Sequence, residues 1–434
     1  MSFRDASPEP QFFRYGTPDN RLALLYNLSR AFNSTLDLDE VLNRVMDEVI
    51  IATRAERGFV MLRDAQEALV FHVARGIDQS TIHDPVFQVS LSIIEGVAKN
   101  GQPVLTDDAQ LDPRFSMRQS VRLLGLRSIL CVPLMVKDRI LGIIYVDNRI
   151  QAGIFTQPDL ELLNAIASSA AIAIENARLY QVAVEKGRLE RELQMASQVQ
   201  MSLLPRDIPH FPDWEFVARW LPARQVAGDY YDFIPGKDGQ LGLLVADVSD
   251  KGMPAALFMA LTRSILRASM DQIEIPMEGM QRANRLICED STSGMFVTIF
   301  FALLDPSNNE LTYVNAGHNP ALFFQHGKRT GQGVLSQLAR TGMALGVDPD
   351  TTYEQRTIRL KPGDFVVLYT DGVIDALNAN TEDFGMDNLE SVILEAREEP
   401  AAEIASRMER QLREFIGNQP LFDDSTFVIL RHSL

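Results

Sequence analysis

The chain has 434 residues, of which 46% are hydrophobic and 23% charged, a composition typical of globular proteins with room for two or three domains. Its formal net charge of -17 argues against nucleic acid or an anionic membrane surface as a partner. The two cysteines cannot build a disulfide framework, and with neither a signal peptide nor an apolar run of membrane-spanning length we expect a cytoplasmic protein.

The N-terminal part of the chain is predicted to begin with a mobile tail. Residues 1–19 contain three prolines and little periodicity. A helical pattern follows over residues 20–53, interrupted by a turn and helix cap at 33–39. Strand patterns and one short helix come next, at 57–62, 68–74, 91–100 (the helix), 104–105, 129–136 and 140–146. This alternation predicts an α+β sandwich with one central sheet.

Three segments in this region carry a resemblance to a known family. They are Leu126-Arg-Ser-Ile-Leu-Cys-Val-Pro-Leu134, Leu141-Gly-Ile-Ile-Tyr-Val-Asp-Asn148 and Phe155-Thr-Gln-Pro-Asp-Leu160. Together with the helix that follows, residues 20–180 resemble a GAF domain. That family binds cyclic nucleotides, haem, bilins, small metabolites or nothing, and many members dimerise, so the ligand stays unknown. Cys131 lies in an apolar strand, where we expect a small buried hydrophobic residue rather than a ligand anchor.

A long helix is predicted to connect the two halves of the chain. From Asp159 to Leu204 apolar residues recur at steps of three and four, as in a parallel coiled coil, with an interruption expected at Gly187 and an end at Pro205. We expect residues 181–205 to be a linker that continues the last GAF helix and to support a homodimer together with the GAF domain. The alternative is a helix lying along its own domain. Residues 196–205 resemble the linker that precedes SpoIIE-type phosphatase domains.

Four aspartates stand at the ends of strands or in turns of the C-terminal half. The apolar runs 241–246 and 365–370 lead directly into Asp247 and Asp371, while Asp229 and Asp423 lie next to further strand patterns. A turn aspartate or a helix cap explains any one of them. Four such carboxylates without histidine or cysteine partners suit hard divalent cations such as Mg²⁺ or Mn²⁺. Two such ions can lower the pKa of a bridging water and hold a phosphoryl group.

Residues 206–434 resemble the bacterial branch of the metal-dependent protein phosphatase 2C family, typified by stage II sporulation protein E. The resemblance implies an α/β/β/α sandwich of two antiparallel sheets flanked by helices. The segments that carry it, in family order, are Ala227-Gly-Asp-Tyr-Tyr-Asp-Phe233, Ala246-Asp-Val-Ser-Asp-Lys-Gly-Met-Pro-Ala-Ala256, Phe296-Val-Thr-Ile-Phe300, Asn315-Ala-Gly-His-Asn-Pro320, Gly342-Met-Ala-Leu-Gly346, Tyr369-Thr-Asp-Gly-Val373 and Asp423-Asp-Ser-Thr426.

The resemblance also implies roles for particular residues. Asp229 would bind one of two Mn or Mg ions, Asp247 would bridge both, and the backbone carbonyl of Val248 would hold the second. Asp371 and Asp423 would hold the first ion from the opposite sheet. A water shared by the ions would attack a phosphoserine or phosphothreonine directly, without a nucleophilic side chain.

Other polar residues near these motifs have two interpretations each. Arg224 has the spacing of a phosphate-binding arginine, although an exposed arginine near a turn is common. Asp232 and Asp375 either orient metal-bound waters or hold a third, weaker ion, or they are solvated acids at strand ends. His318 is expected to have a structural role in a turn. The helical patterns 253–270 and 276–290 are either a switch that the linker moves, as in the resembled family, or plain core.

We therefore expect a Mg- or Mn-dependent serine/threonine phosphatase regulated by a GAF domain. By resemblance, its substrate is a phosphorylated protein, an anti-sigma-factor antagonist of the STAS type in a partner-switching pathway. The alternative is a catalytically weak signalling adaptor that binds phosphoproteins. A nucleotidyl cyclase is a third possibility, disfavoured because no phosphate-cradling segment is apparent.

Overall fold

The computed structural model describes residues 18–32, 34–78, 80–82, 89–290, 294–327 and 333–434. The chain divides into two compact units, which we call the N-terminal unit (Met1–Arg188) and the C-terminal unit (Leu189–Leu434). This division falls inside the predicted linker, 181–205. The predicted tail lies outside the described residues except for Pro18 and Asp19, which already belong to the first helix. In the described ranges, no helix is both long enough and apolar enough to cross a membrane.

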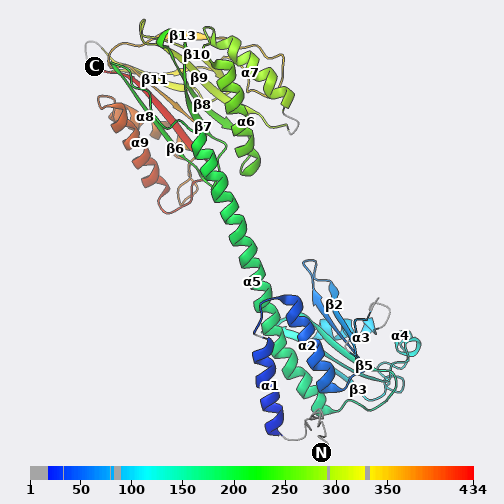
Figure 1. Cartoon of the computed structure of the whole chain (residues 1–434). Helices are drawn as coiled ribbons and strands as arrows, with labels where there is room; N and C mark the ends of the chain where they lie inside the picture. The colour runs from blue at the N-terminus through cyan, green and yellow to red at the C-terminus, as the bar shows by residue number, and fades with distance from the viewer. Residues whose placement is uncertain (1–17, 33, 79, 83–88, 291–293, 328–332) are drawn as a thin grey trace, which may run out of the picture. The chain divides into compact units, whose positions relative to one another are not determined.

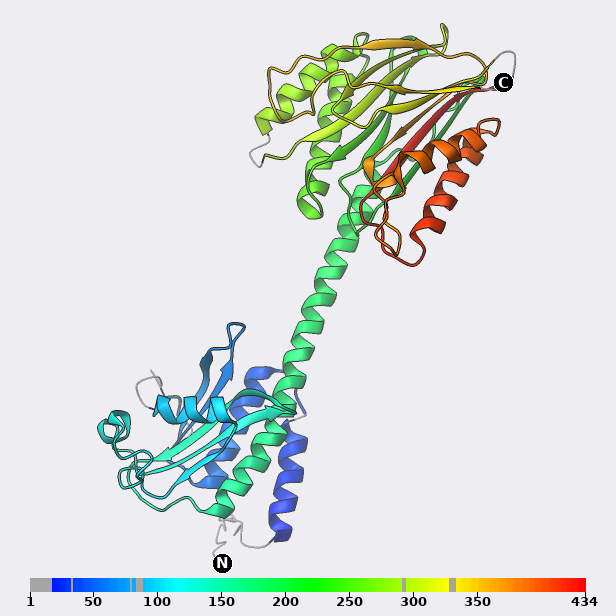
Figure 2. The ribbon, with the colours of Figure 1, turned by 180° about the vertical axis from the view of Figure 1, so that it is seen from behind.

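The N-terminal unit is built around one antiparallel sheet with helices on both faces (Figures 1 and 2). The strand order is β2-β1-β5-β4-β3, with bounds β1 Arg57–Arg63, β2 Leu69–Gly76, β3 Val104–Thr106, β4 Ser128–Val136 and β5 Arg139–Asn148. One face is covered by α1 (Pro18–Phe32), α2 (Leu38–Thr53) and the first half of α5 (Gln157–Leu203). The other is covered by α3 (Leu91–Asn100) and the short α4 (Gln119–Leu123). The α+β sandwich predicted for this region is confirmed.

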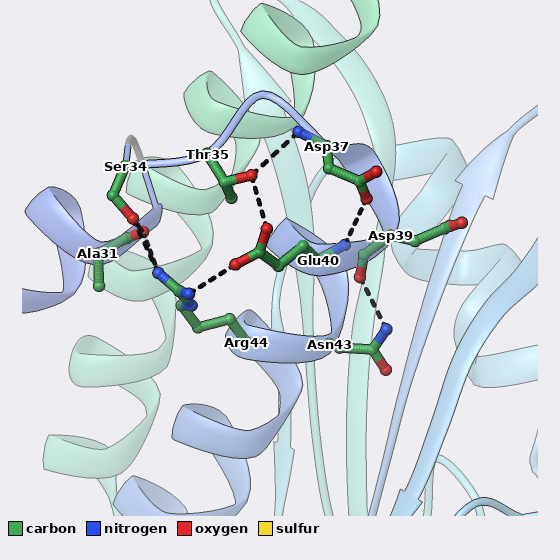
Figure 3. A network of polar contacts seen from close by, with 8 residues as sticks. All are labelled: Ala31, Ser34, Thr35, Asp37, Asp39, Glu40, Asn43 and Arg44. Atoms are coloured by element: carbon green, nitrogen blue, oxygen red, sulfur yellow. Dashed lines mark hydrogen bonds and ion pairs between the residues drawn. The ribbon is translucent and has the colours of Figure 1, made fainter.

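Polar side chains fix the turn between α1 and α2 (Figure 3). Asp37 caps α2 by accepting a hydrogen bond from the backbone N–H of Glu40 at 2.9 Å. The Glu40 carboxylate accepts from the Thr35 hydroxyl at 2.8 Å and pairs with Arg44 at 2.7 Å. Arg44 also donates to the backbone oxygen of Ala31 at 2.9 Å. The turn and cap predicted at 33–39 are therefore present in the residues that are described.

Two buried groups of the N-terminal unit have clear structural roles. Cys131 is fully buried in β4, and burial raises the pKa of its thiol, as expected for a small hydrophobic residue. The buried carboxylate of Asp147 on β5 receives two hydrogen bonds from the guanidinium of Arg57 on β1, at 2.8 and 2.6 Å. This bidentate pair joins two neighbouring strands inside the unit.

Helix α5 runs from Gln157 to Leu203 without a break, as predicted for this stretch, and Gly187 interrupts its apolar pattern but not the helix. A glycine costs a helix only about 1 kcal/mol relative to alanine. Strong helix formers on both sides, Glu185-Lys186 and Arg188-Leu189-Glu190, propagate the helix through it. The first apolar residues of the predicted seam are buried in the core of their own unit: Leu163, Ile166, Ala170 and Ala173. Other apolar side chains of α5, at spacings of seven, three and seven, are more than half exposed: Ile172, Leu179, Val182 and Leu189.

The C-terminal unit consists of two stacked antiparallel sheets of five strands each. The first sheet has the order β13-β10-β9-β8-β7, with bounds β7 Tyr230–Pro235, β8 Leu241–Val248, β9 Val297–Asp305, β10 Glu310–Ala316 and β13 Arg356–Arg359. The second has the order β12-β11-β14-β15-β6, with bounds β6 Trp214–Leu221, β11 Ala321–Gln325, β12 Val334–Leu338, β14 Phe365–Tyr369 and β15 Ser425–His432.

Two pairs of helices enclose these sheets (Figures 1 and 2). Helices α6 (Met253–Met270) and α7 (Pro276–Asp290) pack on the first sheet, while α8 (Gly385–Glu395) and α9 (Ala401–Ile416) pack on the second. A separate core of inward-facing side chains, including Val245, Phe300, Leu368 and Val428, fills the space between the sheets. The predicted α/β/β/α sandwich is confirmed.

Candidate active site

The four aspartates singled out in the sequence come from two pairs of neighbouring strands, one pair in each sheet. In the first sheet Tyr230 pairs with Ala246, so the adjacent residues Asp229 and Asp247 lie side by side at the end of β7 and β8. In the second sheet Asp371 begins a 3-10 turn, Asp371–Val373, directly beyond β14. Asp423 comes two residues before β15, which pairs with β14.

The fold brings these four carboxylates close together, and Asp247 is near each of the other three. Its side chain is within hydrogen-bonding range of Asp229 and feels the charges of Asp371 and Asp423. Burial, followed by the charge of Asp371, raises the pKa of Asp247 to about 7. Burial and the nearby Asp247 likewise raise the pKa of Asp229 well above its ordinary value, and burial also raises that of Asp371. Such a cluster is electrostatically unfavourable until a proton or a cation joins it.

Two neighbours that the sequence interpretation did not assign hold Asp229 in place. The hydroxyl of Thr370, on the opposite sheet, donates to the Asp229 carboxylate at 2.7 Å. The indole N–H of Trp220 donates to the Asp229 backbone oxygen at 2.9 Å. Thr370 immediately precedes Asp371, so a single segment both supplies one carboxylate and orients another. The one feature of the sequence that could have indicated this role of Thr370 is its position inside the motif Tyr369-Thr-Asp-Gly372.

Asp424 has a structural function beside the cluster. Its two carboxylate oxygens accept hydrogen bonds from the backbone N–H groups of Ala223 and Gly228, both at 2.8 Å. Two glycines near the cluster leave little or no room for a side chain. A Cβ on Gly228 would lie 3.1 Å from the backbone oxygen of Val248, and one on Gly372 would lie 2.0 Å from that of Asp424. These close approaches explain the Gly-Asp and Asp-Gly pairs of the motifs.

A lysine from the loop after β8 pairs with the cluster. The ammonium of Lys251 lies 2.7 Å from one carboxylate oxygen of Asp423 and 4.6 Å from the centre of the Phe422 ring. The other oxygen of Asp423 accepts the N–H of Asp424 at 2.9 Å. Both oxygens of Asp423 therefore already have partners. Lys251 belongs to the quoted motif 246–256, but neither its type nor its spacing indicated this contact.

Asp232 has none of the roles predicted for it. It is fully buried, and the guanidinium of Arg267 on α6 donates to both of its oxygens, at 2.6 and 2.7 Å. Arg263 on the same helix lies 3.4 Å away. Asp232 thus anchors α6 to β7 as an ion pair and is neither a solvated acid nor a group that faces the cluster.

Asp375 lies near the cluster, because its charge adds to burial in raising the pKa of Asp371, whereas Arg224 and His318 have other surroundings. Arg224 is exposed in the connection between β6 and β7, and its phosphate-binding role stays a prediction. His318 is buried, with Nδ1 2.7 Å from the Thr298 hydroxyl and Nε2 3.1 Å from the backbone oxygen of Tyr369. Burial lowers its pKa to about 4, so the ring is neutral at physiological pH and ties β9 to β14. This agrees with the structural role expected for it.

The chemistry of the cluster fits a hard divalent cation better than any other group, because its donors are carboxylate oxygens with unfavourable mutual charges. In the described ranges, however, no three His, Cys, Asp or Glu side chains are gathered closely enough to hold a metal ion as they stand. Part of the reason is visible in the contacts: Asp423 is engaged by Lys251.

Comparisons with known proteins match both halves of the chain to known families. Residues 237–433 match the family model for stage II sporulation protein E (SpoIIE), and residues 37–174 match that for the GAF domain. The chain is 31% identical over 272 residues to protein IcfG of Synechocystis sp. and 29% identical over 246 residues to phosphoserine phosphatase RsbU of Bacillus subtilis. These matches cover 56% and 57% of this chain, but 42% of IcfG and 71% of RsbU.

Among solved structures, the SiaA-PP2C domain of Pseudomonas aeruginosa superposes with a TM-score of 0.51 at 22% identity, covering 57% of this chain and 99% of that one. This likeness concerns the fold. The family matches show that the chain joins a GAF domain to a SpoIIE-type domain and is homologous to RsbU.

Proposed function

We propose that this protein is a metal-dependent serine/threonine protein phosphatase that its GAF domain regulates. The observation that carries the proposal is the meeting of Asp229, Asp247, Asp371 and Asp423 from two sheets, with burial and like charge raising the pKa of the first three. A buried group of acids with perturbed pKa values is typical of a functional site. The homology to RsbU, a phosphoserine phosphatase, supports the same reaction here.

The four aspartates and the backbone carbonyl of Val248 would hold two Mn or Mg ions. When bound, such ions supply Lewis-acid stabilisation of a phosphoryl group and an activated water. The chain's own residues hold the geometry: Thr370 and Trp220 orient Asp229, and Asp424 fixes the loop in front of it. His318 is neutral and bonded at both ring nitrogens, so it does not serve as a general base.

The substrate that we propose is a phosphoserine or phosphothreonine in a protein, and specifically an anti-sigma-factor antagonist of the STAS type. The support for the reaction class is the homology to RsbU, and the support for the antagonist is the family resemblance. Arg224 is exposed in the loop that leads to Asp229, where its guanidinium could meet a substrate phosphate.

The decisive experiment compares phosphate release from a phosphoserine protein, with Mn²⁺ present, by the wild type and by Asp247→Ala. We expect a loss of more than about 100-fold, because Asp247 would be the ligand shared by both ions. Asp207→Ala, at an exposed position before β6, is the matched control and should keep full activity. Activity retained by Asp247→Ala would refute the proposal.

A second candidate function is a signalling adaptor that binds phosphoproteins without useful catalysis. One observation favours it, since the described carboxylates do not stand at metal-ligand positions. Calorimetry with Mn²⁺ separates the two candidates. A phosphatase should bind the ion, whereas an adaptor that has lost its metal site should give no heat of binding.

We also propose that the protein is a homodimer joined through the GAF domain and helix α5. The support is the exposed apolar stripe Ile172, Leu179, Val182 and Leu189, whose spacing is that of a coiled-coil seam. Sedimentation equilibrium should give a dimer that Leu179→Glu dissociates. A monomeric wild type would contradict this proposal. The division into a GAF domain at 20–180, a linker at 181–205 and a phosphatase domain at 206–434 stays a prediction.

A further inference from the structure

The loop between β8 and α6 brings one lysine to the edge of the carboxylate cluster. The ammonium of Lys251 lies 2.7 Å from a carboxylate oxygen of Asp423 and 4.6 Å from the centre of the Phe422 ring. Burial raises the pKa of Asp371 and the charge of Lys251 acts in the opposite direction, so the ammonium also lies near that carboxylate. The lysine side chain is 39% exposed, so its positive charge faces both the cluster and the solvent.

The backbone of this loop is fixed where it leaves β8. The N–H of Ser249 donates to the backbone oxygen of Phe296 at 3.0 Å, and the Ser249 hydroxyl accepts the N–H of Phe296 at 2.9 Å. Asp250 and Gly252, on either side of Lys251, both have positive φ, 77° and 80°. This conformation is uncommon for a residue with a side chain, and such backbone is often found at functional sites. A fixed loop therefore presents a side chain that is long, exposed and able to change rotamer.

A cation at Asp423 would compete with Lys251 for the same carboxylate. One oxygen of Asp423 accepts from the backbone N–H of Asp424, and the ammonium holds the other. If a divalent cation took that oxygen, the ammonium would lose its partner and be repelled by a like charge a few ångströms away. The Phe422 ring, which is 56% exposed, would still attract the ammonium through its face. Lys251 would then offer three hydrogen-bond donors to an anion.

A phosphate ester is the anion whose chemistry fits this ammonium. A phosphorylated serine or threonine carries about -1.5 to -2 charge at pH 7 and three acceptor oxygens. It has to approach a group of carboxylates that repels it, so a positive side chain at the edge of the group favours its entry. Lysine is a common phosphate ligand and acts as a point charge that needs no fixed orientation.

We propose that Lys251 is a substrate-binding residue, whose ammonium leaves Asp423 when a cation occupies that carboxylate and then binds the phosphate of the phosphoprotein. The inference rests on the proposed metal-dependent phosphatase function and deepens it by assigning the phosphate contact to one side chain. It also makes phosphate binding conditional on metal binding, because Asp423 holds the ammonium in the metal-free protein.

The test uses the full chain and a fluorescent peptide in which a methylene group replaces the ester oxygen of phosphoserine, so that it cannot be hydrolysed. With saturating Mn²⁺, fluorescence anisotropy should show that Lys251→Met binds this peptide about tenfold more weakly than the wild type, because a charged hydrogen bond to the phosphonate is lost. Lys237→Met, which removes the exposed pair with Glu274, is the matched control for one positive charge and should bind the peptide like the wild type. With a chelator instead of Mn²⁺, the wild type and Lys251→Met should bind the peptide equally weakly.

Two further measurements separate loss of the phosphate contact from damage to the site. In hydrolysis of a phosphoserine protein, Lys251→Met should raise KM about tenfold and keep kcat within about threefold, and Lys251→Arg, which keeps the charge, should keep KM within about threefold of wild type. Calorimetry should show that Lys251→Met binds Mn²⁺ at least as tightly as the wild type. A damaged site would instead weaken the binding of both the peptide and Mn²⁺, and that result would overturn the inference.

Wild-type affinity for the peptide in Lys251→Met would also overturn it, as would an equal loss of affinity with and without Mn²⁺. Failure of the proposed function looks different, because the wild type itself would then show no Mn²⁺-dependent release of phosphate.

Discussion

Each unit of this protein buries carboxylates, but the two units neutralise them differently. In the N-terminal unit, burial raises the pKa of Asp147, and the two hydrogen bonds from Arg57 act in the opposite direction. In the C-terminal unit, burial raises the pKa of Asp247 in the same way, and the neighbouring charges of Asp371 and Asp423 raise it further. The first carboxylate is satisfied by its own chain, whereas the second faces other carboxylates.

The comparison shows that burial of a charge does not by itself mark a functional site. The nature of the partner does, because a carboxylate surrounded by carboxylates is stabilised only by something from outside the chain. Asp232 makes the same point within the C-terminal unit. It is as buried as Asp229, yet Arg267 and Arg263 neutralise it, so it belongs with Asp147 and not with the cluster.

The largest change in the free energy of unfolding is expected from removing Arg57, the arginine of the buried pair in the N-terminal unit. Arg57→Met leaves Asp147 buried without its guanidinium, which should lower the free energy of unfolding of the N-terminal unit by about 3–5 kcal/mol. Urea denaturation of the full chain measures this. Arg149→Met is the control, since it removes a partly exposed pair with Glu56 and should cost less than about 1 kcal/mol. Equal losses in the two variants would break the comparison.

The carboxylate cluster should make the metal-free protein less stable as the pH rises. The pKa of Asp247 is about 7 in the folded protein against an ordinary 3.8, so between these values the folded state binds more protons than the unfolded state. The free energy of unfolding therefore falls by about 4 kcal/mol as the pH rises through this window, of which about 2–3 kcal/mol is lost above pH 5, and it remains low above pH 7.

Urea denaturation in the presence of a chelator, at pH 5 and at pH 8, measures this dependence for the C-terminal unit. Asp247→Asn should flatten it, and saturating Mn²⁺ should raise stability most at pH 8, because the cation replaces the missing proton. A metal-free C-terminal unit that is more stable at pH 8 than at pH 5 would show that the cluster is not electrostatically strained.

A smaller change in the free energy of unfolding is expected when Asp232 loses one of its arginine partners. Arg267→Met removes one of its two guanidinium partners while Arg263 remains 3.4 Å away, so the C-terminal unit should lose about 1–2 kcal/mol of unfolding free energy. The affinity for Mn²⁺ should stay within about twofold of wild type, measured by calorimetry. A large loss of Mn²⁺ affinity would place Asp232 among the residues of the site, contrary to the comparison.

The smallest change in stability is expected at Lys251. Its pair with Asp423 is about one-third exposed on both sides, so Lys251→Met should alter the unfolding free energy by less than about 1 kcal/mol. Mn²⁺ should nevertheless bind a few-fold more tightly, because no ammonium then competes for Asp423. Lys237→Met, which removes the exposed pair with Glu274, controls for the loss of one positive charge. Unchanged affinity in Lys251→Met would show that its ammonium does not compete.

Much of the architecture was predictable because its signals are local. Apolar runs that end on Asp247 and Asp371 mark buried strands that reach the surface, and the cap at Asp37 marks the start of a helix. The resemblance to a known family implied the α/β/β/α sandwich, and the structure confirms it. The long helix α5 was predictable as well, because the single glycine at position 187 is a weak signal against a long run of helix formers.

The partners of the polar side chains could not be predicted in this way. Asp424 bonds to Gly228 across 196 positions of sequence, and Thr370 bonds to Asp229 across 141. Asp229 and Asp232 stand three residues apart in one motif, yet one faces carboxylates and the other faces arginines.

By itself, then, the sequence determined the strands, the helices and which residue types stand at their ends, because these depend on neighbours within a few positions. Only the tertiary structure decided which carboxylates are neutralised, by Arg57, Arg267 or Lys251, and which remain to attract a cation. The physical reason is that the charge state of a buried acid depends on groups a few ångströms away in space. The separation of two residues along the sequence does not show whether they are such neighbours.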